Sequence, residues 1–189
     1  MPAIYLSPSV QEFNPYIIGG NEEYYMNRLA DAMVPYLRAS GISFTRNNPG
    51  NTLSQVIAQS NAGNYDLHLA LHSNSSPENM RGVLQGPDVY FFTTSAKGHK
   101  AADMIAANLK NIYSNSSLVT VIPTTTLAEV RKTRAPAVLV ETAYQDNYAD
   151  ATWLRDNINL IARNLVQSLT EYFGISFVDL LLGQNDSAK

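Results

Sequence analysis

Residues 66–76 read DLHLALHSNSS, an apolar run that carries two histidines and ends in four small polar residues. A short apolar run bounded by polar residues is typical of a buried β-strand. Side chains alternate between the two faces of a strand, so His68 and His72 share one face, and His72 lies where the strand ends. The two positions are about 13 Å apart at ~3.3 Å per residue. We therefore expect His72 to face a ligand at the edge of a sheet. We expect His68 to be a structural or groove residue that cannot share a metal ion with His72.

Strand and helix patterns alternate along the rest of the chain. Strands are predicted at residues 3–7, 41–46, 65–73, 88–94, 117–123 and 135–144, and helices at 22–41, 52–63, 96–114 and 150–174. This alternation is typical of a largely parallel sheet that is covered on both faces. The sequence therefore predicts a single-domain α/β fold, with a mostly parallel, twisted sheet of about six strands and helices on both faces.

The composition is that of a folded globular domain, because 45% of the 189 residues are hydrophobic and 15% are charged. A net charge of −3 without any basic block argues against binding to nucleic acid. The absence of cysteine excludes disulfides, thiolate metal ligands and cysteine nucleophiles. No apolar run approaches the roughly 20 residues of a membrane span, and no signal peptide is visible at the N-terminus.

Three side chains at the ends of predicted elements are candidates for chemistry. His72 and Glu141 both end strands, and the carboxyl ends of parallel strands form the edge at which ligands bind. A carboxylate next to a core costs several kcal/mol unless it is paired or bound to a cation. Glu22 begins a helix, where a carboxylate also favours the helix dipole. Alternative interpretations are a salt bridge between Glu141 and Arg131 or Arg134, and an unremarkable edge position for His72.

Three motifs stand out in the sequence: Glu22 with Gly41 nineteen residues later, HSNS at 72–75, and PAVLVETAYQDN at 136–147. Together they resemble the motifs of the zinc-dependent N-acetylmuramoyl-L-alanine amidases of the Amidase_3 type. The resemblance extends from Ile4 to about Gly174. It implies a metal-dependent hydrolase that cleaves the amide between N-acetylmuramic acid and L-alanine of peptidoglycan.

The resemblance also implies roles for individual residues. Glu22 and His72 match two ligands of a single zinc ion, and Glu141 matches the glutamate that acts as general base and general acid. Glu23 is the alternative to Glu22, because a shift of one residue still leaves it at the helix start.

One position departs from the family pattern. The family's first histidine ligand falls at about Val10, which cannot bind a metal, so Gln11 or Glu12 is the candidate replacement. This departure keeps a second function open: a catalytically impaired relative that binds peptidoglycan or muropeptides without cleaving them.

The remaining expectations concern the substrate, the domain boundaries and the location. Asn74, Ser75 and Arg131 are the candidate substrate-binding residues. We expect a catalytic domain over residues 1–174 and a C-terminal extension over 175–189 whose end is disordered. The expected partner is peptidoglycan or a muropeptide. We expect action at the bacterial cell wall, whether the chain is released, spore-associated or trimmed of a signal, and otherwise a cytoplasmic location.

Overall fold

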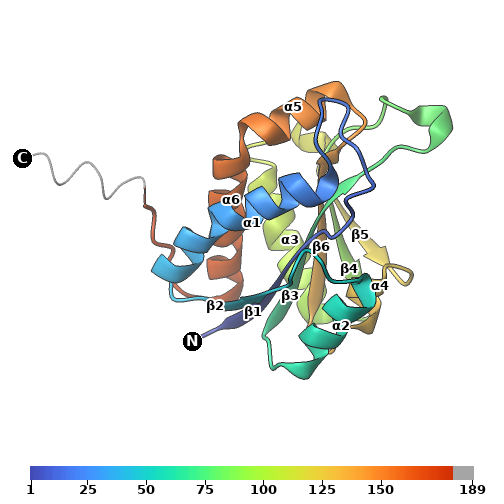
Figure 1. Ribbon diagram of the computed structural model, residues 1–189. Coiled ribbons are helices and arrows are strands. Elements are labelled where there is room, and N and C mark those ends of the chain that lie inside the picture. Colours follow the sequence, from blue (N-terminus) through green and yellow to red (C-terminus); the bar gives the residue numbers. More distant parts are fainter. Residues whose placement is uncertain (181–189) are drawn as a thin grey trace, which may run out of the picture.

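The computed structural model describes residues 1–180, which form one six-stranded sheet with helices on both faces (Figure 1). The strands are β1 (Ala3–Pro8), β2 (Ser43–Arg46), β3 (Leu67–Asn74), β4 (Asp88–Phe92), β5 (Thr120–Thr124) and β6 (Ala137–Tyr144). The α-helices are α1 (Glu22–Ala39), α2 (Leu53–Ala62), α3 (Ala96–Leu109), α4 (Ala128–Lys132), α5 (Tyr148–Asp156) and α6 (Ile158–Phe173). Two 3₁₀ turns lie at η1 (Glu78–Met80) and η2 (Ser116–Leu118). The predicted single-domain α/β fold is confirmed.

The order of the strands brings the ends of β3 and β6 together. The order is β2-β1-β3-β6-β4-β5, and β2, β1, β3 and β6 are parallel to one another. His72 is therefore the direct neighbour of Glu141 across the β3–β6 pair. β4 and β5 run together in the opposite direction, and Asp88 at the start of β4 is the neighbour of Glu141 on its other side. The sheet is thus mostly parallel, with one antiparallel pair next to the catalytic candidate.

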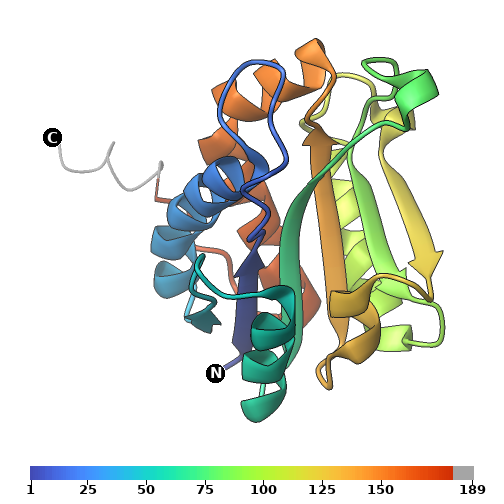
Figure 2. The same cartoon turned by 45° about the vertical axis from the view of Figure 1, so that its right-hand side comes forward.

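The two faces of the sheet are covered differently (Figure 2). On one face α1, α3 and α6 enclose the main hydrophobic core, which includes Leu67, Leu69 and Leu71 of β3. On the other face lie the smaller α2 and α4, and Val130 of α4 packs with Ala70 and Leu139 in a minor cluster. Since side chains alternate along a strand, His68 and His72 share this second face with Ala70.

The start of α1 is fixed by a side-chain cap. Asn21 accepts a hydrogen bond from the backbone N–H of Tyr24, which satisfies one free donor of the first turn. Glu22 is the first residue of the helix and is buried, whereas its neighbour Glu23 is only partly buried.

Two helices differ from the prediction. The helix expected at 150–174 is two helices, α5 and α6, because the backbone leaves the helical region at Asn157, with φ −118° and ψ 18°. The second difference is α4, which was not predicted at all. It has five residues, about one and a half turns, so no apolar periodicity of 3.6 residues can develop in its sequence.

The chain beyond α6 packs back onto the domain. Ile175 and Phe177 contact the main core, Phe177 stacks on Tyr36 at a ring distance of 5.9 Å, and the backbone N–H of Val178 donates to Ser40 Oγ. The predicted disorder at the end of the chain lies outside the described residues. Within residues 1–180, no helix has both the length and the apolar character that crossing a membrane requires.

Candidate active site

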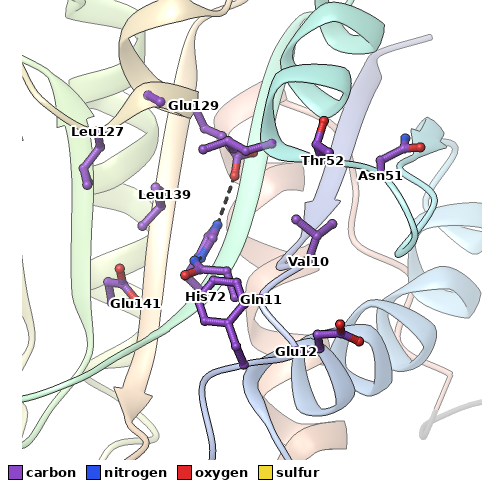
Figure 3. Close-up of a pocket in the computed structure, with 13 residues that line it drawn as sticks. Val10, Gln11, Glu12, Asn51, Thr52, His72, Leu127, Glu129, Leu139 and Glu141 are labelled. Carbon is purple, nitrogen blue, oxygen red and sulfur yellow. Dashed lines mark hydrogen bonds and ion pairs between the residues drawn. The ribbon is translucent and has the colours of Figure 1, made fainter.

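A pocket of about 510 Å³ lies on the face of the sheet that carries α2 and α4, near the carboxyl ends of β1, β3 and β6 (Figure 3). Its lining residues are Val10, Gln11, Glu12, Phe13, Asn51, Thr52, Leu53, His72, Leu127, Ala128, Glu129, Leu139 and Glu141. The walls are mostly apolar, whereas the titratable groups His72, Glu129 and Glu141 converge on its base. Apolar walls with a few convergent polar groups are typical of a ligand site.

His72 lies between two carboxylates. Its Nδ1 is 2.8 Å from Glu22 Oε1, and its Nε2 is 3.0 Å from Glu129 Oε1. All three side chains are buried, with exposed fractions of 7% for His72, 1% for Glu22 and 4% for Glu129. Both ring nitrogens are therefore engaged, one by a residue of α1 and the other by a residue of α4.

The second oxygen of Glu129 extends this network into the core. Glu129 Oε2 lies 2.8 Å from His68 Nε2 and accepts a hydrogen bond of 2.6 Å from Ser7 Oγ. The other ring nitrogen of His68, Nδ1, is 2.9 Å from Ser60 Oγ. His68 is thus a structural residue, as predicted, but Glu129 connects it to His72.

The charges in this network follow from its contacts. Burial alone would lower the pKa of His72, but the hydrogen bonds and charges of Glu129 and Glu22 raise it well above 6.5. Burial would raise the pKa of Glu129, but the hydrogen bonds from His68 and His72 hold it well below its usual range. The pKa of Glu22 is also lowered, because hydrogen bonds from His72 and Asn14 outweigh the effect of burial. Both carboxylates are therefore ionised at neutral pH, and a protonated His72 lies between them.

The surroundings of Glu141 raise its pKa, whereas those of Glu22 and Glu129 lower theirs. Burial raises its pKa to about 7, the neighbouring charges of Glu22, Asp88 and Glu129 add to this effect, and His72 opposes it. Glu141 Oε2 is buried without a hydrogen-bond partner in the described part of the chain. Within the same residues, Glu141 forms no ion pair with Arg131 or any other cation. Glu141 therefore presents a carboxyl group of mid-range pKa to the pocket.

Gln11, one of the two candidate replacements for the missing first ligand, lies next to His72. Gln11 Nε2 is 3.3 Å from His72 Nδ1, and Gln11 Oε1 accepts a hydrogen bond from Asn14 Nδ2 at 3.0 Å. The same Asn14 nitrogen donates to Glu22 Oε2 at 2.7 Å. Glu12 is exposed at the rim, and its carboxylate points away from His72 (Figure 3).

The structure also distinguishes Glu22 from its alternative, Glu23, and shows what Val10 offers to the pocket. Glu22, and not Glu23, contacts His72, because the first residue of α1 faces the end of β3. Val10 lines the pocket beside Gln11 but offers only an apolar side chain.

The predicted substrate-binding residues lie outside the pocket lining. Asn74 donates to Asp88 Oδ2 at 3.1 Å and accepts from the backbone N–H of Ser75, which is exposed. Arg131 is exposed and lines a separate hollow together with Arg134 and Lys97. The loop that follows Asn74 is thus adjacent to the site. Arg131 does not line the pocket.

The structure adds one site residue that sequence reasoning missed, Glu129. Its only signal in the sequence is an isolated carboxylate between Leu127 and Val130, both apolar. Within residues 1–180, no three His, Cys, Asp or Glu side chains are grouped so as to hold a metal ion. The geometry explains this result, because Glu22 and Glu129 lie at opposite nitrogens of His72 and do not converge on one point.

Solved structures of amidases share this fold. The N-acetylmuramoyl-L-alanine amidase AmiC2 of Nostoc punctiforme has a TM-score of 0.79 and 17% sequence identity, over 92% of this chain and 97% of that chain. The catalytic domain of CwlV, an N-acetylmuramoyl-L-alanine amidase from Bacillus (Paenibacillus) polymyxa var. colistinus, has a TM-score of 0.79 and 16% identity, over 93% of this chain and 100% of that chain. An N-acetylmuramoyl-L-alanine amidase from Clostridium difficile 630 has a TM-score of 0.80 and 12% identity, over 92% and 97%. At these identities the likeness establishes the fold.

The family follows from the sequence itself. No curated protein matches the chain. The family model Amidase_3, described as N-acetylmuramoyl-L-alanine amidase, matches residues 15–171, which include Glu22, His72, Glu129 and Glu141. The chain therefore belongs to the Amidase_3 family of N-acetylmuramoyl-L-alanine amidases, enzymes that hydrolyse an amide bond of peptidoglycan.

Proposed function

We propose that this chain is a zinc-dependent hydrolase that cleaves the amide between N-acetylmuramic acid and L-alanine of peptidoglycan. Glu141 is the general base and general acid, and Glu22 and His72 are two ligands of the zinc ion. Because the substrate is bacterial cell-wall material, we propose that the chain acts at the cell wall. The observation that carries this proposal is the buried, unpartnered Glu141 Oε2 in the same pocket lining as His72, whose Nδ1 is paired with Glu22 behind it.

Glu22 and His72 are side chains of the types that zinc uses, whereas the other neighbour of His72 Nδ1, Gln11, is an amide. Two ligands at zinc–ligand distances of about 2.0–2.1 Å in a tetrahedral site lie roughly 3.3 Å apart. Glu22 Oε1 and Gln11 Nε2 lie 2.8 Å and 3.3 Å from His72 Nδ1, close to that spacing. Gln11 coordinates if its amide turns so that Oε1 takes the place of Nε2. Catalytic zinc sites have three protein ligands and one open position, so we propose Gln11 over Glu12 as the third ligand.

The proposed chemistry divides between the ion and the protein. Zinc bound at this site would activate a water molecule at neutral pH and polarise the amide carbonyl. Glu141 removes the proton from the attacking water and then delivers it to the leaving amine of L-alanine. A pKa of about 7 suits both steps, because the group must accept and release a proton at the working pH. Phe13, Leu53 and Leu127 form apolar parts of the pocket wall.

A second candidate function is binding of peptidoglycan or muropeptides without cleavage. It is favoured by the engagement of both His72 nitrogens by carboxylates and by the presence of an amide, Gln11, and not an imidazole as the third side chain at His72. In this alternative the protonated His72 remains an ion-pair partner of Glu22 and Glu129.

One experiment separates the two functions. Zinc-reconstituted protein and its Glu141→Gln variant are incubated with purified peptidoglycan, and new L-alanine amino termini are quantified by mass spectrometry. The hydrolase proposal requires product from the native protein and a loss of about 10²–10⁴-fold in the variant, the range for removing a general base. Sedimentation of both proteins with peptidoglycan and no product from either supports binding without cleavage.

A further inference from the structure

We infer that the hollow on the far side of α4 is a second substrate-binding site, in which Arg131, Arg134 and Lys97 bind the free carboxylates of the peptide stem of peptidoglycan. The inference rests on the proposed function for its ligand, because it places the amide next to L-alanine in the pocket. It goes beyond that function by naming where the rest of the peptide lies and which chemical form of the peptide binds.

The pocket and this hollow carry opposite charges. Among the described residues that line the pocket there are three glutamates and no lysine or arginine. The hollow has a volume of about 400 Å³, and the described residues that line it include Lys97, Arg131 and Arg134 but no aspartate or glutamate. A carboxylate of the substrate is therefore repelled at the pocket and attracted to the hollow.

The three cations are available to a ligand. Within residues 1–180, none of them forms an ion pair with an aspartate or glutamate, whereas three arginines elsewhere in that range each pair with an aspartate. All three side chains are exposed. Arg134 donates from Nη1 to the backbone oxygen of Asn61 at 3.0 Å, a contact that orients its guanidinium and leaves other N–H groups free to donate.

The helix α4 separates the pocket from the hollow. Its buried side chains are Glu129, at the base of the pocket, and Val130, which packs with Leu139 of β6. Ala128 and Arg131 are three residues apart and share the outward face of the helix. Ala128 lines the pocket and Arg131 lines the hollow, so the two sites meet across about 4.5 Å of helix at 1.5 Å per residue.

An extended peptide is long enough to cross this helix. Each residue spans up to about 3.3–3.6 Å, so two residues cover about 7 Å, more than the rise from Ala128 to Arg131. The residues that follow L-alanine in the stem carry its free carboxylates. A guanidinium binds a carboxylate through two parallel hydrogen bonds, which suits Arg131 and Arg134 to this role. The peptide therefore leaves the pocket over Ala128, and its carboxylates bind in the hollow.

The test compares two synthetic ligands that differ only in charge. One is N-acetylmuramoyl-L-alanyl-γ-D-glutamyl-L-lysine with its two free carboxylates, and the other is the same compound with both carboxylates amidated. Calorimetry with a chelator present measures the dissociation constants of the native protein without cleavage. We expect the compound with free carboxylates to bind about ten times more tightly at low salt. This preference should decline as salt is added, because the cations are exposed.

Two double variants assign the preference to the hollow. Arg131→Gln with Arg134→Gln should reduce it to about twofold or less, with native affinity for the amidated compound, because the pocket is unchanged. Arg28→Gln with Lys110→Gln is the matched control. It also removes two exposed cations, but from α1 and from the C-terminal end of α3, on the other face of the sheet. It should keep the tenfold preference.

Three results would overturn the inference: equal affinity of the native protein for the two compounds, no binding of either, or the same loss of preference in both double variants. The proposed function is tested separately, by incubating the zinc-reconstituted protein with each compound. It fails if neither compound yields a new L-alanine amino terminus, whatever the two affinities are.

Discussion

Glu22 Oε1 and His72 Nδ1 lie 2.8 Å apart, although fifty residues separate them in the sequence. The contact joins the first residue of α1 to the carboxyl end of β3, and the neighbouring strand β6 adds Glu141 at the same level. Two of these three groups are charged at neutral pH and buried, a combination that persists only when the charges are paired or bind an ion. The site is therefore built around His72.

Because Glu22 contacts His72, we predict that its carboxylate is needed for zinc binding. Glu22→Gln replaces the anionic ligand by a neutral amide of the same size, so zinc affinity should fall by more than about 100-fold, beyond the effect of an outer partner. Zinc stoichiometry after reconstitution and dialysis measures this. Glu23→Gln is the matched control, since its side chain does not contact His72, and it should bind zinc like the native protein. Equal losses in both variants would mean that the helix start, and not this carboxylate, matters.

Gln11 and Glu12 are adjacent in sequence and differ in orientation. Gln11→Ala removes the amide that lies beside His72, whereas Glu12→Ala removes an exposed carboxylate at the rim. We expect Gln11→Ala to weaken zinc binding at least about tenfold and Glu12→Ala to leave it unchanged, as measured by chelator competition. The reverse pattern would assign the third ligand to Glu12.

Glu141 should impose a pH dependence on stability in metal-free protein. Its pKa is about 7 in the folded state against 4.5 for the ordinary group, so the folded state holds a proton that the unfolded state releases. Stability from this residue is complete below about pH 4.5 and is lost as the pH rises through about 7. The glutamine of Glu141→Gln does not titrate, so the variant keeps its stability as the pH rises. At pH 8 its free energy of unfolding should exceed that of the native protein by up to about 3 kcal/mol.

Urea unfolding with a chelator present, at pH 5 and at pH 8, measures this difference. At pH 5 the gap between the two proteins should be small, because Glu141 is protonated in the folded native protein. A gap of the same size at both pH values contradicts the assignment of a raised pKa to Glu141.

One carboxylate, that of Asp146, binds two backbone amides of the loop after β3. Asp146 accepts hydrogen bonds from the backbone N–H groups of Ser76 and Gly82, at 2.9 Å and 2.7 Å. Asp146→Ala removes both acceptors and should lower stability by about 1–3 kcal/mol. It should also abolish the protection of these two amides from hydrogen exchange. Ser75→Ala, at an exposed position of the same loop, is the control and should keep the protection. Unchanged protection in Asp146→Ala would show that other contacts hold the loop.

The parts of the fold that sequence alone predicts are those with long, regular patterns. The apolar runs of β3 and β6 identify buried strands, and the polar residues that end them, His72 and Glu141, follow from where those runs stop. The reversed direction of β4 has no such signal, because a strand reads the same in either direction. Its connection from β3 contains only the 3₁₀ turn η1 and no crossover α-helix.

Site residues could be predicted only where a local sequence pattern, such as the end of an apolar strand, identifies the side chain by itself. Glu129 was missed because its partners His68, His72 and Ser7 lie more than fifty residues away, and α4 is too short to show periodicity. The choice between Glu22 and Glu23 depends on a rotation of about 100° around the helix axis, which only the docking of α1 on the sheet fixes.

The most direct test is a crystal grown with zinc and measured at the zinc absorption edge. The account requires one anomalous peak between the carboxylate of Glu22 and Nδ1 of His72, with Glu141 facing it across the pocket and the Nε2 contact to Glu129 intact. A structure of the same protein with no zinc at that place, and with His72 still hydrogen-bonded to both carboxylates, would contradict it.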